Sequence, residues 1–253
     1  MFFARLLQAN NPKWVQLMFA GLDNPVCKQV MARGIRLTKS SAQAIPIAEY
    51  VIAHAFSLIV PIESQREAQQ KKEWRRTPFR EIGLTRWTLI GFGSIGREIA
   101  RRIRSFGVHL TAVRRSPSPD RLADAVIDLA GLPTVLPESD VVVLASPLND
   151  ETRGMADDVF FGAMKEGAIL INIARGGLID EEALQRGLAR DKPAHAILDV
   201  FDDGRGGRFR AQGQRDARLA DPRDCVLCGK GLAHLAALGS AADYAVWRQY
   251  PLA

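Results

Sequence analysis

Short aliphatic runs alternate with amphipathic stretches over the second half of the chain. Two amphipathic stretches, 94–107 and 181–190, space apolar residues three or four positions apart, as in a helix packed on one face. The aliphatic runs occupy residues 87–91, 108–113, 140–147, 168–174 and 194–201. Runs that are apolar at nearly every position are typical of strands buried on both faces of a parallel sheet. The pattern predicts an α/β fold, a doubly wound parallel sheet with helices on both faces.

A long apolar stretch precedes these runs. Residues 45–74 are predicted to form a helix whose first half, IPIAEYVIAHAFSLIV, should be buried nearly all round. Its second half, ESQREAQQKKEWRR, is strongly polar, so we expect the helix to leave a core and run onto a surface or a partner subunit. His54 is expected to be a core or interface residue, whereas His109 and His195 fall in predicted strands.

The segment 202–223 breaks the alternation of strands and helices. It contains six arginines and four glycines but almost no aliphatic residues. Such a segment buries little apolar surface, so it is predicted to be loop or disordered.

Length and composition restrict the class of protein. With 253 residues, 47% of them hydrophobic, the chain suffices for one or two domains. Its longest nearly apolar run, 50–60, is far shorter than the roughly 20 residues that span a bilayer. Polar residues interrupt the N-terminus where a signal peptide needs an apolar region, and three cysteines are too few for a disulfide framework. We therefore expect a cytoplasmic protein without a membrane partner.

Charge and cysteine spacing predict neither a nucleic-acid partner nor a metal site. The net charge is +6, but the arginines form short scattered clusters without interleaved aromatic residues, so no nucleic-acid partner is expected. Cys225 and Cys228 form a C-x-x-C pair, yet a zinc site needs a second pair of ligands. No metal site is predicted.

A glycine-rich turn carries the clearest chemical signal. Gly91, Gly93 and Gly96 form G-x-G-x-x-G directly after an apolar run and before an amphipathic stretch that begins with Ser94 and Ile95. The first glycine permits the tight turn, the second lets the backbone approach a pyrophosphate, and the third lets helix and strand pack closely. The pyrophosphate would lie at the helix N-terminus, where free N–H groups favour an anion. The motif predicts a dinucleotide site.

The residues after the next strand indicate which dinucleotide is bound. Arg114, Arg115 and Ser116 stand where an NAD site carries an acidic residue for the ribose 2′-hydroxyl. Arginine instead suits the 2′-phosphate of NADP, and we expect no acidic side chain to compete here. The predicted cofactor is NADP, with NAD possible. The alternative is that both arginines are solvated surface residues.

Beyond the glycines, the chain resembles the D-isomer-specific 2-hydroxyacid dehydrogenases. Residues 136–184 resemble the family's second and third signature regions almost without a gap. Residues 14–24 are similar to its substrate loop, and HLAALG, 234–239, to its catalytic-histidine motif. The resemblance covers about Lys13 to Asp202 and resumes near Gly231. Family members named glyoxylate or hydroxypyruvate reductases often carry arginine after the second strand, which agrees with the predicted cofactor.

The resemblance implies roles for individual residues. Arg175 matches the arginine that holds the substrate carboxylate and polarises its 2-oxo group, and a guanidinium suits a carboxylate bidentately. His234 matches the general acid that protonates the carbonyl oxygen. The backbone of Ala20 and Gly21 would donate further N–H groups to the carboxylate. Asp199 matches the residue that meets the nicotinamide carboxamide. The remaining expected cofactor contacts are Ser146, Pro147, Ile173 and Ala174.

The chain also departs from the family pattern. The family's third catalytic residue is a glutamate that orients the histidine, and Gly204 stands at its position. The 30 residues from Gly204 to His234 exceed the family spacing and resemble nothing in the family, which is consistent with a frame disruption in the gene. Against the family pattern, we expect a partial substrate domain, because no counterpart of its usual first strands is seen and little sequence follows His234.

Together these features predict a cofactor domain at 77–231 and a partial substrate domain formed by 1–76 and 232–253. The expected activity is reduction of a small 2-oxo acid, of the glyoxylate or hydroxypyruvate type, to its D-2-hydroxy acid. A homodimer is expected, as is usual in the family. The alternative is a catalytically impaired homologue that binds NAD(P) and acts by dimerisation or protein interaction, which Gly204 favours.

Overall fold

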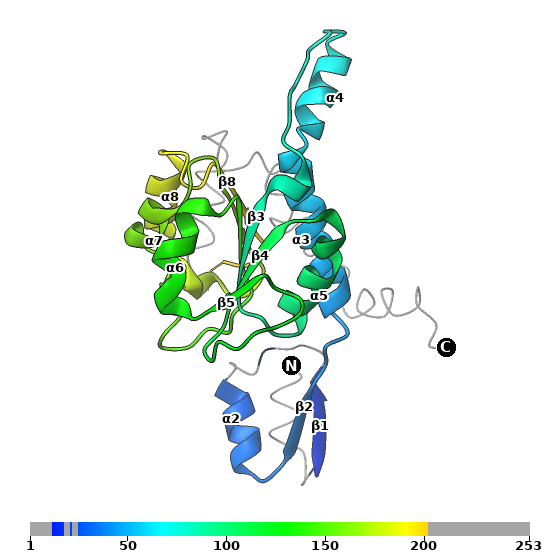
Figure 1. The fold of residues 1–253 in the computed structure, drawn as a ribbon. Helices are drawn as coiled ribbons and strands as arrows, with labels where there is room; N and C mark the ends of the chain where they lie inside the picture. The colour runs from blue at the N-terminus through cyan, green and yellow to red at the C-terminus, as the bar shows by residue number, and fades with distance from the viewer. Residues whose placement is uncertain (1–11, 18–20, 22–24, 202–253) are drawn as a thin grey trace, which may run out of the picture.

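The computed structural model describes residues 12–17, 21 and 25–201 (Figure 1). Ala20, Gly204, His234 and the C-x-x-C pair lie outside the described residues, as does the loop predicted for 202–223.

A parallel six-stranded sheet forms the centre of the described chain, in the order β5-β4-β3-β6-β7-β8. Its strands are β3 (Arg86–Ile90), β4 (His109–Val113), β5 (Ala125–Ile127), β6 (Val141–Leu144), β7 (Ile169–Asn172) and β8 (His195–Leu198). The order reverses at β3, whose two neighbours are β4 and β6. The predicted doubly wound sheet is confirmed, and His109 and His195 lie in strands as predicted.

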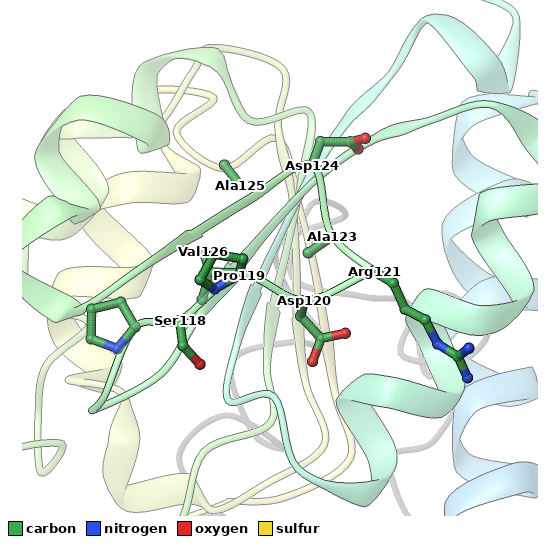
Figure 2. A pocket seen from close by; sticks show the side chains of 9 residues that line it. Ser118, Pro119, Asp120, Arg121, Ala123, Asp124, Ala125 and Val126 are labelled. Carbon is green, nitrogen blue, oxygen red and sulfur yellow. The ribbon is translucent and has the colours of Figure 1, made fainter.

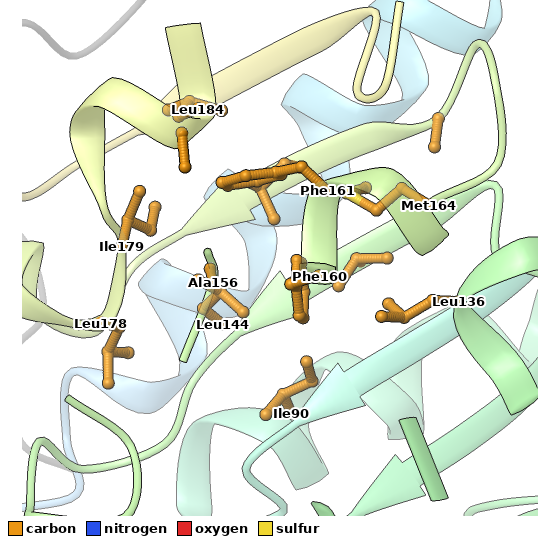
Figure 3. Close-up of a cluster of buried hydrophobic side chains, with 14 of the residues drawn as sticks. Ile90, Leu136, Leu144, Ala156, Phe160, Phe161, Met164, Leu178, Ile179 and Leu184 are labelled. Carbon is orange, nitrogen blue, oxygen red and sulfur yellow. The ribbon is translucent and has the colours of Figure 1, made fainter. Parts of the chain in front are cut away.

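Helices cover both faces of this sheet (Figure 1). They are α3 (Ala44–Ile59), α5 (Ser94–Ile103), α6 (Leu132–Val135), α7 (Asp158–Ala163) and α8 (Glu181–Leu188). Along β6, Val141 and Val143 pack with α3 and α5, whereas Val142 and Leu144 join the cluster of the opposite face. Figure 3 shows that opposite cluster, in which α7 contributes Phe160 and Phe161. Because strand residues alternate between the two faces, both faces of β6 must be apolar.

The helix predicted for 45–74 is instead two helices, α3 and α4 (Ile62–Gln70), with a bend of 57° between them. Pro61 causes the break, because proline lacks an N–H donor and forces the preceding residue, Val60, into extended backbone. Within the single chain, the apolar half is also not buried all round. Only one face is buried, at Ala44, Ala48, Val51 and Ala55.

Ile45, which lies outside this buried face of α3, is 48% exposed. Among the described residues, no single helix is long and apolar enough to cross a membrane; α3 and α4 pass such a test only when they are counted together across their bend.

A small unit precedes the sheet. Strands β1 (Trp14–Leu17) and β2 (Arg36–Lys39) pair in parallel, and α2 (Pro25–Ala32) lies between them in sequence. Val15, Leu17, Cys27, Val30 and Ile35 form its core. The boundary predicted at residue 77 stays a prediction, and α3, which precedes it, packs on the six-stranded sheet.

Candidate functional site

A cleft of about 430 Å³ lies at the carboxyl ends of β3, β6 and β7. It is lined by Gly21, Lys39, Gly93, Ser94, Ile95, Ala145, Ser146, Pro147, Leu148, Ile173, Ala174 and Arg175. Nine of these are residues predicted from the sequence, drawn from four separate segments of the chain. In open parallel sheets, ligands bind beyond the carboxyl ends of the strands, where the strand order reverses.

The three glycines of the turn have different surroundings. Gly91 has φ +106°, and a Cβ there would lie 2.4 Å from the Ser146 nitrogen. A Cβ on Gly96 would lie 2.3 Å from the Gly91 carbonyl oxygen, so helix α5 and the turn are in close contact. At Gly93 a Cβ would meet nothing within 4 Å, and the residue lines the cleft. The dinucleotide motif needs its glycines for three purposes: a tight turn, close packing of helix and strand, and close approach of the backbone to the pyrophosphate.

Helix α5 begins at this turn, with Gly93 as its N-cap. Gly93 provides no side-chain cap, and the first turn of the helix contains no acidic residue. Free N–H groups and the positive end of the helix dipole therefore favour an anion in the cleft.

Two buried polar atoms support the same interpretation. Ser146 Oγ and Asp199 Oδ1 are buried and have no hydrogen-bond partner in the described structure. Buried polar atoms are rarely left unpaired, and Ser146 lines the cleft itself. Burial raises the pKa of Asp199 above its ordinary value. The open Gly93, the uncapped helix and these two atoms fit a dinucleotide.

Arg175 follows β7 on a turn that a buried amide holds. Asn172 Nδ2 donates to the Arg175 carbonyl at 2.9 Å, and Asn172 Oδ1 accepts from the Ala174 N–H at 3.0 Å. The Asn172 carbonyl accepts from the Asp199 N–H at 2.9 Å, which joins the ends of β7 and β8. Arg175 is thereby presented at the cleft by a fixed backbone. Asn172 was missed, although a fully buried amide in an apolar run is a detectable signal.

Sequence reasoning also missed Lys39, Ala145 and Leu148. Ala145 and Leu148 flank the predicted Ser146 and Pro147 after β6. Lys39 ends β2, and no sequence signal distinguished it from other surface lysines.

The arginines after β4 differ in their surroundings, and none of the three predicted residues there lines the cleft. Arg115 has a 75% exposed side chain with its Nε 3.7 Å from Glu151, and Ser116 is exposed. Arg114 is folded back, with Nη2 donating to the Ser118 carbonyl and hydroxyl. The expectation that no acidic side chain competes is wrong. Asp120, six positions further along, lies 3.9 Å from Arg114 Nη1 because the loop before β5 turns back.

A second hollow, of about 460 Å³, lies against residues 117–126 (Figure 2). Asp120 and Arg121 both line it.

Comparison with known proteins agrees with this geometry. A family model described as "D-isomer specific 2-hydroxyacid dehydrogenase, NAD binding domain" matches residues 52–226. The chain is 33% identical over 184 residues to D-3-phosphoglycerate dehydrogenase 3, chloroplastic, of Arabidopsis thaliana, covering 72% of this chain and 31% of that protein. It is 32% identical over 200 residues to the human glyoxylate reductase/hydroxypyruvate reductase, covering 75% of this chain and 60% of the human protein.

A solved structure is also similar. It is a D-isomer specific 2-hydroxyacid dehydrogenase from Xanthobacter autotrophicus Py2 in complex with NADPH and MES, with a TM-score of 0.68 and 28% identity. The match covers 80% of this chain and 64% of that one. This chain spans between 31% and 60% of the length of the two curated relatives. Family model, fold and glycine turn agree: the chain belongs to the D-isomer-specific 2-hydroxyacid dehydrogenases and contains their NAD-binding domain.

Proposed function

We propose that this protein reduces a small 2-oxo acid, of the glyoxylate or hydroxypyruvate type, to its D-2-hydroxy acid with NADPH. The observation that carries the proposal is the cleft in which Arg175 lies with the glycine turn and the start of α5. The human relative and one from Thermotoga maritima are named as reductases of hydroxypyruvate, the human one also of glyoxylate.

In the proposed reaction the residues of the cleft bind cofactor and substrate, and proton transfer is assigned to His234, which lies outside the described residues. The start of α5 and Gly93 hold the cofactor, which supplies a hydride to C2 of the substrate when bound. The Arg175 guanidinium binds the substrate carboxylate bidentately and polarises the neighbouring carbonyl. His234, the general acid implied by the resemblance, donates a proton to the carbonyl oxygen, so that C=O becomes CH–OH.

The proposal is tested with Arg175→Lys and Arg175→Ala in the full chain. A lysine keeps the charge but loses the bidentate fork, so we expect KM for hydroxypyruvate to rise roughly tenfold and NADPH affinity to stay unchanged. Arg190→Ala serves as the control, because Arg190 is exposed outside the cleft and pairs with Asp158. Turnover that is indifferent to Arg175→Ala contradicts the proposed role.

A second function follows from Gly204, which stands at the position of the family's orienting glutamate. Without that carboxylate the chain would bind NADPH yet turn over little or no substrate, and would act through dimerisation or protein contact. Tight NADPH binding without detectable turnover of either oxo acid would favour this second function.

A further inference from the structure

Three charged side chains from three elements meet at the carboxyl end of β4. Arg97 lies on the first turn of α5, Arg114 directly follows β4, and Asp120 lies in the loop before β5. Asp120 Oδ2 is 2.5 Å from Arg97 Nη1 and 3.9 Å from Arg114 Nη1. The Asp120 side chain is only 9% exposed. One carboxylate is thus shared between two arginines at the edge of the dinucleotide site.

All three groups are held in place, Arg114 by its hydrogen bonds to Ser118. The Asp120 Oδ1 accepts a hydrogen bond from the Leu122 N–H at 3.1 Å, which fixes the carboxylate. Arg97 lies over the Phe92 ring, 5.5 Å from its centroid, and Phe92 is the second residue of the glycine turn. The hydrogen bond from Arg97, together with that from Leu122, holds the pKa of Asp120 below its ordinary value. The carboxylate is therefore ionised at neutral pH.

The charges of the cluster affect the two cofactors in opposite ways. Arg97 and Arg114 carry two positive charges against one on Asp120, so the cluster attracts an anion, as the 2′-phosphate of NADPH requires. The Asp120 carboxylate repels that phosphate and neutralises part of Arg114. It also provides the kind of acceptor that binds the 2′-hydroxyl of NADH. Arg97 limits the repulsion, because it is the nearer partner of Asp120.

We propose that Asp120 is a specificity-determining residue of the cofactor site, which weakens the preference for NADPH and keeps NADH as a usable cofactor, while Arg97 opposes this effect. The proposal rests on the cofactor use proposed above. From the sequence, the preference for NADPH depends on Arg114 and Arg115 alone. This proposal adds two residues with opposite effects: Asp120 weakens the preference for NADPH, and Arg97 strengthens it.

The test measures the dissociation constants of NADPH and NADH by titration of the full chain at fixed ionic strength. Asp120→Asn keeps an acceptor for the Leu122 N–H but removes the charge. We expect it to raise the ratio of the NADH to the NADPH dissociation constant about fivefold, mainly through tighter NADPH binding. Asp124→Asn is the matched control. Asp124 lines the same hollow as Asp120, at its other end in Figure 2, but it accepts from the Leu110 N–H at 2.8 Å and contacts neither arginine.

Arg97→Gln provides an independent test in the opposite direction. Without Arg97, Asp120 pairs with Arg114 alone, so we expect NADPH affinity to fall about fivefold and the double variant with Asp120→Asn to recover it. The proposal is overturned if Asp120→Asn leaves the ratio of the two dissociation constants unchanged. Equal loss of affinity for both cofactors would likewise show that the role of Asp120 is purely structural. Failure of the unaltered chain to bind either cofactor would be a different result, because it would overturn the proposed function itself.

Discussion

Gly91 and Gly93 belong to one turn, yet a methyl group would have different effects at the two positions. Gly91→Ala places a Cβ 2.4 Å from backbone atoms of Ala145 and Ser146, at a φ of +106°, so we expect a loss of roughly 2 kcal/mol or more in unfolding free energy. Gly93→Ala meets open space and should cost no more than about 1 kcal/mol, because alanine is a poorer N-cap residue than glycine.

The same pair separates fold from binding. Gly93→Ala should weaken NADPH binding at least roughly tenfold, because the methyl group would occupy the space through which a pyrophosphate approaches the backbone. Urea unfolding and cofactor titration on both variants provide the measurements. Unchanged NADPH affinity in a well-folded Gly93→Ala would contradict the assigned role of Gly93.

Asp199 gives a pH-dependent prediction. Burial raises its pKa in the folded chain, so the folded state disfavours the ionised form. The resulting cost is absent below the unfolded pKa of about 3.9 and develops fully as the pH rises through the folded pKa. Asp199→Asn should therefore stabilise the cofactor-free protein by about 1 kcal/mol at pH 7, and the gain should disappear below about pH 4.

Thermal unfolding measured between about pH 3.5 and pH 8 tests this prediction, because that range includes the unfolded pKa of about 3.9. Asp150→Asn, at an exposed carboxylate, is the control and should leave stability nearly unchanged. A stabilisation by Asp199→Asn that persists at the lowest pH would show that charge is not the cause.

At the scale of elements, α3 and α4 bear on assembly. Helix α4 projects away from the sheet (Figure 1), and Trp74, which follows it, is 100% exposed in the single chain. Large apolar side chains exposed beside a half-buried apolar helix are typical of protein interfaces. We propose that the pair of helices forms the surface of a homodimer.

Light scattering at micromolar concentration should give a dimer. Trp74→Ser should weaken the dimer at least about tenfold, because tryptophans at interfaces are often hot spots that contribute about 2 kcal/mol or more. Val159→Ser is the matched control, since Val159 is 76% exposed on α7, at the other face of the sheet. A monomeric unaltered chain would exclude this assembly under those conditions.

The sequence predicted elements where burial dictates the residue pattern. Five of the six strands of the main sheet were predicted because their residues are apolar on both faces. Strand β5 was missed, because its three residues are only partly buried at the edge of the sheet. The break at Pro61 was detectable from proline chemistry alone, yet residues 45–74 were predicted as one helix.

For the candidate site, the glycine motif pointed to Gly93, Ser94 and Ile95, and the family resemblance pointed to the other six predicted residues that line the cleft. Gly93, Ser146 and Arg175 belong to separate segments that the parallel sheet aligns at one edge. Asp120 was missed because its approach to Arg97 and Arg114 depends on how the loop before β5 folds back, and no periodic pattern encodes such a path. Long-range charge contacts of this kind become visible only in three dimensions.

At the scale of the whole molecule, the expected rate of turnover depends on whether every group that the reaction needs is present and correctly oriented. Arg175 and the cofactor cleft can bring a carbonyl and a hydride donor together, and positioning alone accelerates a reaction. In the proposed mechanism His234 must still donate a proton, and Gly204 stands where the resemblance places the residue that orients the histidine ring. Loss of an orienting carboxylate costs on the order of 10⁴ in rate in serine proteases.

We therefore predict weak reductase activity that a carboxylate at position 204 increases. A general acid contributes typically about 10² to 10⁴ in rate, and most of that contribution is lost if the imidazole is misoriented. Gly204→Glu should raise kcat with glyoxylate or hydroxypyruvate at least about tenfold, while NADPH affinity stays unchanged. Gly204→Gln separates charge from size, because a neutral amide favours the protonated imidazole less than a carboxylate does. Equal rates for all three proteins would show that position 204 does not act on the histidine, and a fully active unaltered chain would contradict the predicted impairment.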